Sequence, residues 1–196
     1  MSSSIRDLLD LHYRNKLGHL SSTLTAYPII KEIYETKAAE DVFILSQGHA
    51  ALALYTVLGK GQELYERHGV HPHRDIEDGI YCTTGSLGMG ITVAVGAAMA
   101  GKTVHCLVSD GECSEGVVWE ALNYIEIHTL PITVHINYNG QTALGYNTMS
   151  RTLLDYYTCT VLHEAEDLPL PFTNTIADHY KPMTEEDYAK ALRGFT

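Results

Sequence analysis

Apolar residues in this chain occur as short continuous runs that alternate with longer segments of helical character. The short runs have the length of buried strands and lie at residues 41–46, 104–108, 132–136 and 157–162. The longer segments are expected to be helices from their apolar spacing or their small residues, at residues 5–17, 24–36, 50–58, 91–100, 115–129 and 184–192. This alternation predicts an α/β fold in which helices flank a parallel sheet with right-handed crossovers.

Single residues predict several element boundaries. Pro28 is expected in the first turn of the second helix, where a missing N–H costs little. Thr184 precedes three acidic residues and is expected to cap the last helix. Residues 59–84 are polar and contain several Gly and His, so we expect them to be mostly irregular. After Thr142 the pattern weakens.

Composition limits the class of protein. The 196 residues are 45% hydrophobic, which is enough for a substantial core, and we expect a single domain over residues 1–196. The net charge of −11 argues against nucleic acid as the main partner. No apolar run approaches the roughly 18 residues of a membrane span, and the first residues lack the order of a signal peptide. The cysteines have no zinc-module spacing, so a reduced, cytoplasmic setting is the simplest expectation.

Polar side chains follow two of the predicted strands. Asp110 comes just after the run at 104–108, and Asn139 comes after the run at 132–136, with one predicted helix between them. In an open parallel sheet both would lie at the carboxyl edge, where ligands bind. Their oxygens suit Mg²⁺ or Ca²⁺, and Mg²⁺ usually completes its coordination with substrate phosphates and water. The pair therefore suggests a metal-bridged diphosphate.

The same residues also have simpler interpretations. Asp110 could only cap the helix that follows it, and Asn139 with Gly140 could only form a turn. His19 and His49 could be ordinary hydrogen-bonded histidines. No companion Cys or H-E-x-x-H motif supports a zinc cluster formed by His68, His71 and His73.

Several short motifs, taken in order, resemble the N-terminal diphosphate-binding (PP) domain of transketolase. Any one of them alone would be a weak glycine motif, whereas their joint order is specific. The resemblance covers roughly residues 15–145 and implies a thiamine-diphosphate-binding fold. The motifs are Gly18 to Ser22, Phe43 to Ala50, His71-Pro72, Thr84 to Gly90, Asp110 to Ala121 and Asn139-Gly140.

The resemblance implies a site for thiamine diphosphate together with Mg²⁺ or Ca²⁺. The implied metal ligands are the side chains of Asp110 and Asn139 and the backbone carbonyl of Gln141. The implied cofactor contacts are His49, His71, Gly85, Leu87, Gly111 and Asn139. Backbone N–H groups in a glycine turn at a helix start independently suit an anion.

The resemblance also implies residues that act on the substrate. His19, His71 and His179 would line a channel and hydrogen-bond the hydroxyl groups of a donor ketose. Glu115 would belong to a network of carboxylates that couples paired cofactor sites. Imidazoles suit such roles because they donate to oxygen and titrate near neutral pH.

The chain departs from the family pattern at three places. Ser109 stands where the metal motif usually has its first glycine, which could tighten or distort the loop. The stretch between Asn139 and His179 is short, so the C-terminal end of the domain looks trimmed and one sheet edge is expected to need a partner. The sequence ends at Thr196, before the pyrimidine-binding (Pyr) domain that supplies a glutamate to the cofactor in the family.

These features together predict the small N-terminal subunit of a two-component, transketolase-like transferase. It would move a two-carbon ketol unit from a ketose, or sugar phosphate, to an aldehyde. The expected partner is a C-terminal subunit bearing the Pyr domain, in a heterotetramer with two copies of each chain. The alternatives are a condensation like that of deoxyxylulose-phosphate synthase, or a non-catalytic binding protein that keeps the cofactor fold.

Overall fold

The sheet of this protein is parallel and its strands follow one another in chain order. The computed structural model describes residues 5–140, 149–165 and 180–195. Within them the sheet has four strands in the order β1-β2-β3-β4, and all neighbouring pairs are parallel. The strands are β1 (Val42–Leu45), β2 (Val104–Ser109), β3 (Ile132–Tyr138) and β4 (Thr160–Glu164).

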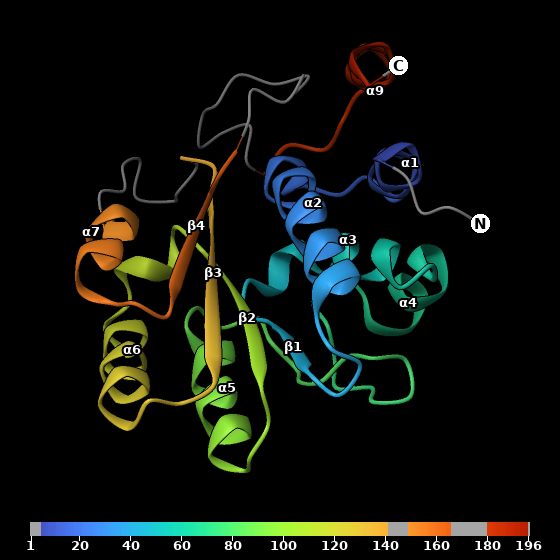
Figure 1. Cartoon of the computed structure of the whole chain (residues 1–196). Coiled ribbons are helices and arrows are strands. Elements are labelled where there is room, and N and C mark those ends of the chain that lie inside the picture. The colour runs from blue at the N-terminus through green and yellow to red at the C-terminus, as the bar shows by residue number, and fades with distance from the viewer. Residues whose placement is uncertain (1–4, 141–148, 166–179, 196) are drawn as a thin grey trace.

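Helices cover both faces of this sheet (Figure 1). Right-handed crossovers between consecutive strands place α5, α6 and α7 on one face, and the remaining helices lie on the other. The helices are α1 (Ile5–Arg14), α2 (Leu20–Thr36), α3 (Ala51–Val57), α4 (Gly61–His68), α5 (Met89–Met99), α6 (Gly116–His128), α7 (Met149–Tyr156) and α9 (Glu185–Gly194), with short 3-10 turns η1 (Gly48–Ala50) and η2 (Glu112–Ser114).

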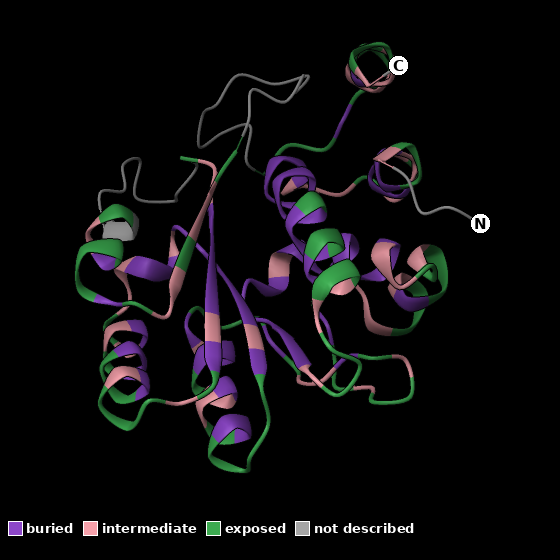
Figure 2. Ribbon diagram, in the orientation of Figure 1, coloured by how far each residue is buried: buried purple, intermediate pink, exposed green. Residues whose placement is uncertain are grey.

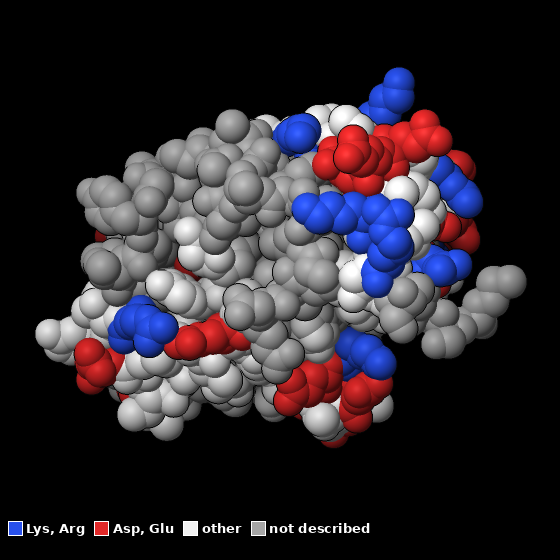
Figure 3. Space-filling view, turned by 90° about the horizontal axis from the view of Figure 1, so that it is seen from above, with Lys and Arg blue, Asp and Glu red and all other residues white. Residues whose placement is uncertain are grey.

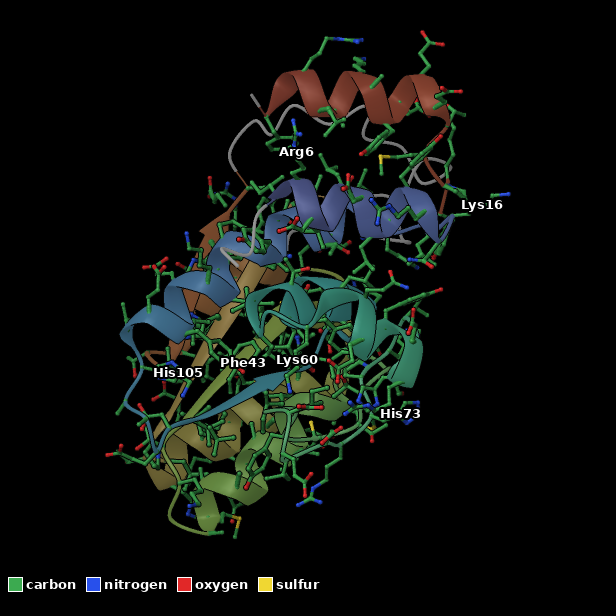
Figure 4. All side chains as sticks on the ribbon, turned by 90° about the vertical axis from the view of Figure 1, so that its right-hand side faces the viewer. Arg6, Lys16, Phe43, Lys60, His73 and His105 are labelled. Atoms are coloured by element: carbon green, nitrogen blue, oxygen red, sulfur yellow. The ribbon has the colours of Figure 1, made fainter. Side chains whose placement is uncertain are left out.

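The sheet separates two hydrophobic cores. Successive strand side chains point to opposite faces, so Phe43 belongs to the core that includes residues of α1 to α4 and α9, whereas Ile44 belongs to the core that includes residues of α5, α6 and α7. β1, β2 and β3 are accordingly almost continuously buried, whereas the residues of β4 are intermediate or exposed (Figure 2). Phe43, labelled in Figure 4, meets Tyr34 of α2 edge-to-face, with 5.4 Å between ring centroids. The apolar runs therefore predicted β1, β2 and β3 correctly, whereas the run at 157–162 begins three residues before β4.

The second helix begins earlier than its sequence indicated. It starts at Leu20 rather than Leu24, so Pro28 lies inside the helix and the expectation of a first-turn position was wrong. The side chain of Pro28 is exposed, in a helix whose other residues from Leu20 to Ile30 are buried. This extensive burial offsets the hydrogen bond that a proline removes from a helix interior.

Two further helices were not expected from the sequence. α4 lies within the segment expected to be mostly irregular, and it is anchored in the core by the buried Leu64 and the partly buried Tyr65. α7 lies in the region of weak pattern and buries Leu153. The last helix was predicted correctly: Thr184 accepts from the Asp187 N–H, and Asp187 accepts from the Thr184 N–H, as a capping box requires.

Three histidines form a row on the face of the sheet covered by α2. Nδ1 of His105 lies 3.2 Å from Nε2 of His135, and Nδ1 of His135 lies 3.0 Å from Nε2 of His163. Burial lowers the pKa of His135 to about 3, and the two neighbouring histidines add to the effect. The middle ring is therefore neutral at pH 7. His105, labelled in Figure 4, begins the row beside Asp41, 3.6 Å from its Oδ2.

The described residues contain no helix that is both long and apolar enough to cross a membrane.

Candidate functional site

Asp110 and Asn139 meet at the carboxyl edge of the sheet, as their positions in the sequence predicted. Asp110 is 2% exposed. Its Oδ1 accepts from the Gly111 N–H at 2.9 Å, and its Oδ2 accepts from the Gly140 N–H at 2.8 Å. The Asn139 amide nitrogen donates to Oγ1 of Thr25 on α2 at 3.3 Å, which orients that amide. The loops after β2 and β3 are thus held together by one carboxylate.

The carboxyl group of Asp110 titrates well above its ordinary range. Burial raises its pKa to about 6, against the opposing effect of the backbone N–H groups of Gly140, Gly111 and Asn139. A desolvated carboxylate held by backbone donors favours a nearby cation. A bound divalent metal ion would offset the cost of keeping this buried carboxylate ionised.

Glu112 is a site residue that the sequence reasoning missed. Its side chain is fully buried, and Oε1 accepts from the Ser46 hydroxyl at 2.6 Å and from the Gly88 N–H at 2.9 Å. Oε2 accepts from the Ser109 N–H at 2.8 Å. Glu112 therefore joins the loops that follow β1, precede α5 and follow β2. In the sequence, the signal that could have identified Glu112 was its position within the Asp110–Gly116 motif.

Ser109, the departure from the family's metal motif, takes part in this network. Its hydroxyl lies 3.2 Å from Oε2 of Glu112 and also accepts from the Glu112 N–H at 3.2 Å. The side chain is thus used to close the loop on itself. The serine that was expected to tighten or distort the loop thus contributes hydrogen bonds to it.

A cavity lined by histidines lies next to the loop that follows β1, through His49. It has a volume of about 260 Å³, and its lining includes His19, His49 and His71 together with Tyr180. The rings of His19 and His49 lie 5.1 Å apart, and the ring of Tyr180 meets His19 edge-on at 5.0 Å. His19 and His71, which the resemblance placed together in a channel, thus line one pocket, and His49 lines it as well.

His19 has a left-handed backbone at the start of α2, with φ of 59°. Such conformations are uncommon for residues other than glycine and concentrate at functional sites. Its carbonyl accepts from both the N–H and the hydroxyl of Thr23. The turn therefore directs this imidazole away from the axis of α2 and into the cavity lining.

The loop after β1 connects the histidine cavity to the carboxylates. Ser46 bonds Glu112, and Oε1 of Gln47 accepts from Asn137 at 3.3 Å. Gly48 approaches the backbone of Thr84 and Gly85 so closely that an added Cβ would lie 2.9 Å from three atoms of that segment. A glycine is required there, and the close approach sets His49 against the Gly85 loop.

The other predicted residues surround the same region, with two exceptions. Gly85 lies next to the ring of His71, since a Cβ at Gly85 would be 3.5 Å from Cδ2 of that ring. Leu87 is 47% exposed, and Glu115 is half-buried at the N-cap of α6. Gln141 and His179 lie outside the described residues.

Figure 3 views the molecule from this carboxyl edge and shows acidic and basic side chains interleaved over α1 and α9. Lys181, before α9, and Asp187, on α9, form an ion pair with 3.8 Å between Nζ and Oδ2. Exposed pairs of this kind contribute little to stability.

The histidines of the 59–84 segment do not gather around a metal. His71 lines the cavity, whereas Nε2 of His68 lies 3.3 Å from Oδ2 of Asp75. Across the described ranges no group of three or more His, Cys, Asp or Glu side chains is placed to hold a metal ion. The donors expected at the carboxyl edge are of another kind, because they combine the Asp110 carboxylate with the Asn139 amide oxygen and a backbone carbonyl.

The donor chemistry at the carboxyl edge fits a hard divalent cation and a diphosphate. A buried carboxylate and an amide meet there, and oxygen donors of this kind suit Mg²⁺. The 3-10 turn η2 begins at Glu112, two residues after Asp110, and the Gly111 N–H at its N-cap donates to the Asp110 carboxylate. The histidine cavity adjoins it through the loop after β1.

Comparison with known proteins gives a consistent family. Residues 21–106 match the family described as transketolase, thiamine diphosphate binding domain. This match includes His49, His71 and Gly85 but ends before Asp110. The chain is also similar to one subunit of the apulose-4-phosphate transketolase of Phocaeicola vulgatus. The two are 34% identical over 142 residues, which covers 58% of this chain and 50% of that relative.

Whole transketolases are similar over a smaller share of their length. The chain is 38% identical over 116 residues to transketolase of Pongo abelii, covering 49% of this chain and 18% of the relative. It is 32% identical over 158 residues to transketolase-like protein 2 of Bos taurus, covering 65% of this chain and 25% of that relative. The chain thus spans half or less of these relatives. Residues 21–106 thus match the thiamine diphosphate-binding domain of transketolase, and the parallel sheet flanked by helices is consistent with the fold of that domain.

Proposed function

We propose that this chain is the diphosphate-binding subunit of a two-component transketolase-like enzyme. The observations that carry the proposal are the Asp110 carboxylate, held between Gly111 and Gly140, and a cavity lined by four histidines. The similarity to a relative named as one subunit of a transketolase supports the two-component arrangement. The reaction would transfer a two-carbon ketol unit from a ketose, free or phosphorylated, to an aldehyde.

The proposed metal is Mg²⁺, or Ca²⁺ in its place. The Asp110 and Asn139 side chains would bind it, with the backbone carbonyl of Gln141. The diphosphate would be held by His49, His71 and the Gly111 N–H, and Gly85 and Leu87 would contact the aminopyrimidine side. When bound, thiamine diphosphate supplies the carbanion chemistry, and the protein supplies orientation and electrostatics.

The proposed substrate contacts come from histidines that face the cavity. His19, His71 and His179 would hydrogen-bond the hydroxyl groups of the donor sugar and hold them against the cofactor. Glu115 would join a carboxylate network between paired sites. All of these groups act by positioning and by donating hydrogen bonds.

The proposed partner bears the Pyr domain and closes the cofactor site from the other side. The exposed Leu87, at the loop before α5, would lie in that interface. So would α5, whose outward face includes the exposed Gly96 and Met99. We propose two copies of each chain, a single domain for this one, and a cytoplasmic location.

The first test is reconstitution. Mixing this chain with a Pyr-bearing partner should give a complex of two copies of each by light scattering, and ketol transfer should appear only in the mixture. A deoxyxylulose-phosphate-synthase-like enzyme would instead turn over only with a 2-oxo acid donor. Cofactor binding without any turnover in the mixture would indicate a non-catalytic binding protein. Robust transfer by the purified chain alone would contradict the two-component arrangement.

The histidines of the cavity should divide into two classes. His19→Ala should lower turnover by roughly 10²–10³-fold, because a preorganised hydrogen bond is lost in the transition state, while cofactor affinity stays near wild type. His49→Ala should weaken cofactor affinity as well. Calorimetric titration with thiamine diphosphate and steady-state assays on the same complexes separate the two effects.

His179→Ala is expected to behave like His19→Ala. His128→Ala, at the last residue of α6 and absent from the cavity lining, provides the control. Wild-type turnover in both the His19 and His179 variants would show that the channel assignment is wrong.

A further inference from the structure

His12 is a buried polar side chain among the leucines of α1. It is 1% exposed, and the other buried residues of that helix are Leu8, Leu9 and Leu11. Within the part of the chain that the structure describes, neither ring nitrogen has a hydrogen-bond partner of normal geometry, and the polar group that acts most closely on the ring is the Leu17 backbone. Buried polar groups in proteins are nearly always paired. An imidazole left unpaired in an apolar helix face therefore calls for an explanation.

The ring of His12 borders the same cavity as His19, His49 and His71. No resemblance points to it, because it precedes the Gly18–Ser22 motif. The volume of about 260 Å³ is near the lower end of ligand pockets. A ligand that enters between the other three histidines would thus reach a fourth imidazole, which comes from α1.

The protonation state of His12 restricts the ligand. Burial lowers its pKa to about 4; the Leu17 backbone opposes this effect and His19 adds to it. At neutral pH the ring therefore has one N–H donor and one nitrogen acceptor. A hydroxyl group can pair with either ring nitrogen, because it both donates and accepts a hydrogen bond, whereas an ionised phosphate oxygen can only accept one. The described lining of the cavity also contains no Lys or Arg.

We propose that His12 is a substrate-binding residue, whose neutral ring exchanges a hydrogen bond with a hydroxyl group of a sugar at the α1 side of the cavity. The inference rests on the proposed function and adds to it a specificity determinant. His12 selects a polyhydroxylated carbon chain at this end of the pocket in preference to a phosphate or an apolar group.

The variant His12→Leu separates binding from stability. Leucine matches the neighbouring residues of α1 and removes the unpaired nitrogens, so the unfolding temperature should stay the same or rise. The affinity for a polyol should fall about tenfold, the effect of losing one hydrogen bond of the stronger kind. His12→Asn, which keeps a donor and an acceptor, should recover part of that affinity.

Tyr55→Phe is the matched control. Its hydroxyl is also buried without a partner in the described residues, and Tyr55 is absent from the cavity lining. Removing this hydroxyl should leave polyol affinity unchanged while having the same sign of effect on stability. The comparison shows whether loss of affinity follows from the cavity or from any buried polar atom.

The direct measurement uses the full chain with ¹⁵N-labelled histidine, loaded with Mg²⁺ and thiamine diphosphate. The ring signals of His12 are assigned as those missing in His12→Leu. Titration with xylitol should shift both ring nitrogens, whereas pentane-1,5-diol, which has no interior hydroxyl groups, should not. The ring signals of His19, His49 and His71, which line the same cavity, give the polyol affinities of all variants in the same titrations.

The outcomes distinguish the two proposals. If the cofactor binds and the His12 signals stay fixed under xylitol, the inference is overturned and the proposed function stands. A His12→Leu variant that unfolds at lower temperature with unchanged xylitol affinity would show a purely structural role, which also overturns it. Failure of the wild-type chain to bind thiamine diphosphate by calorimetry, with or without its partner, would instead contradict the proposed function.

Discussion

Replacing Asp110 with alanine is expected to abolish metal-dependent binding of thiamine diphosphate. Asp110 is the buried carboxylate at the meeting point of the loops after β2 and β3, and the backbone N–H groups of Gly111 and Gly140 hold its two oxygens in place. Without it the cation loses its charged ligand. Calorimetric titration in Mg²⁺ should therefore show no saturable binding, whereas Asp155→Asn, an exposed carboxylate on α7, should bind as wild type.

The same carboxylate predicts how binding depends on pH. Burial raises the pKa of Asp110 to about 6, and a metal ion binds the ionised form. Cofactor affinity should thus be constant above pH 6 and fall about tenfold per unit below it, because binding must release a proton. A raised carboxyl pKa also means that the metal-free chain loses stability as pH rises through 6, and Mg²⁺ should restore it. Affinity that does not change between pH 5 and pH 8 would contradict this assignment.

Glu112→Ala is expected to be the most destabilising single substitution near the site. It leaves the Ser46 hydroxyl and the N–H groups of Gly88 and Ser109 buried without their acceptor. Since each unsatisfied buried donor costs roughly 1–3 kcal/mol, the free energy of unfolding should fall by about 3–5 kcal/mol. Urea denaturation followed by circular dichroism measures it.

Two further variants identify the cause. Glu112→Gln keeps the size and one acceptor oxygen, so it should lose less stability than Glu112→Ala. Glu120→Ala, at an exposed position of α6, should stay within about 0.5 kcal/mol of wild type. If Glu112→Ala were as stable as Glu120→Ala, the network would not hold the three loops together.

These two residues differ in how far the sequence revealed them. Asp110 was recognisable because a polar residue directly follows an apolar strand, and parallel strands bring their carboxyl ends to one edge. Glu112, two positions later, has no such local signal. Its partners Ser46 and Gly88 lie 66 and 24 residues away, so only the folded chain shows that it is buried and bonded to several loops.

The sequence by itself determined the elements whose signals are local. Continuous apolar runs indicated the strands, and Thr184 with its acidic successors indicated the capped last helix. The order of the glycine and histidine motifs indicated the family. Each of these signals rests on contacts between residues close in the chain, or on motifs that keep their spacing.

The tertiary structure decided what depends on contacts between distant segments. Pro28 lies inside α2 because burial along that helix outweighs a missing hydrogen bond, and burial is not visible from a propensity. His12 resembles an ordinary polar residue of an amphipathic helix in the sequence. It lines the histidine cavity only because α1 packs against α2 and α3. The physical reason is that long-range packing, not local pattern, selects which polar groups are taken out of water.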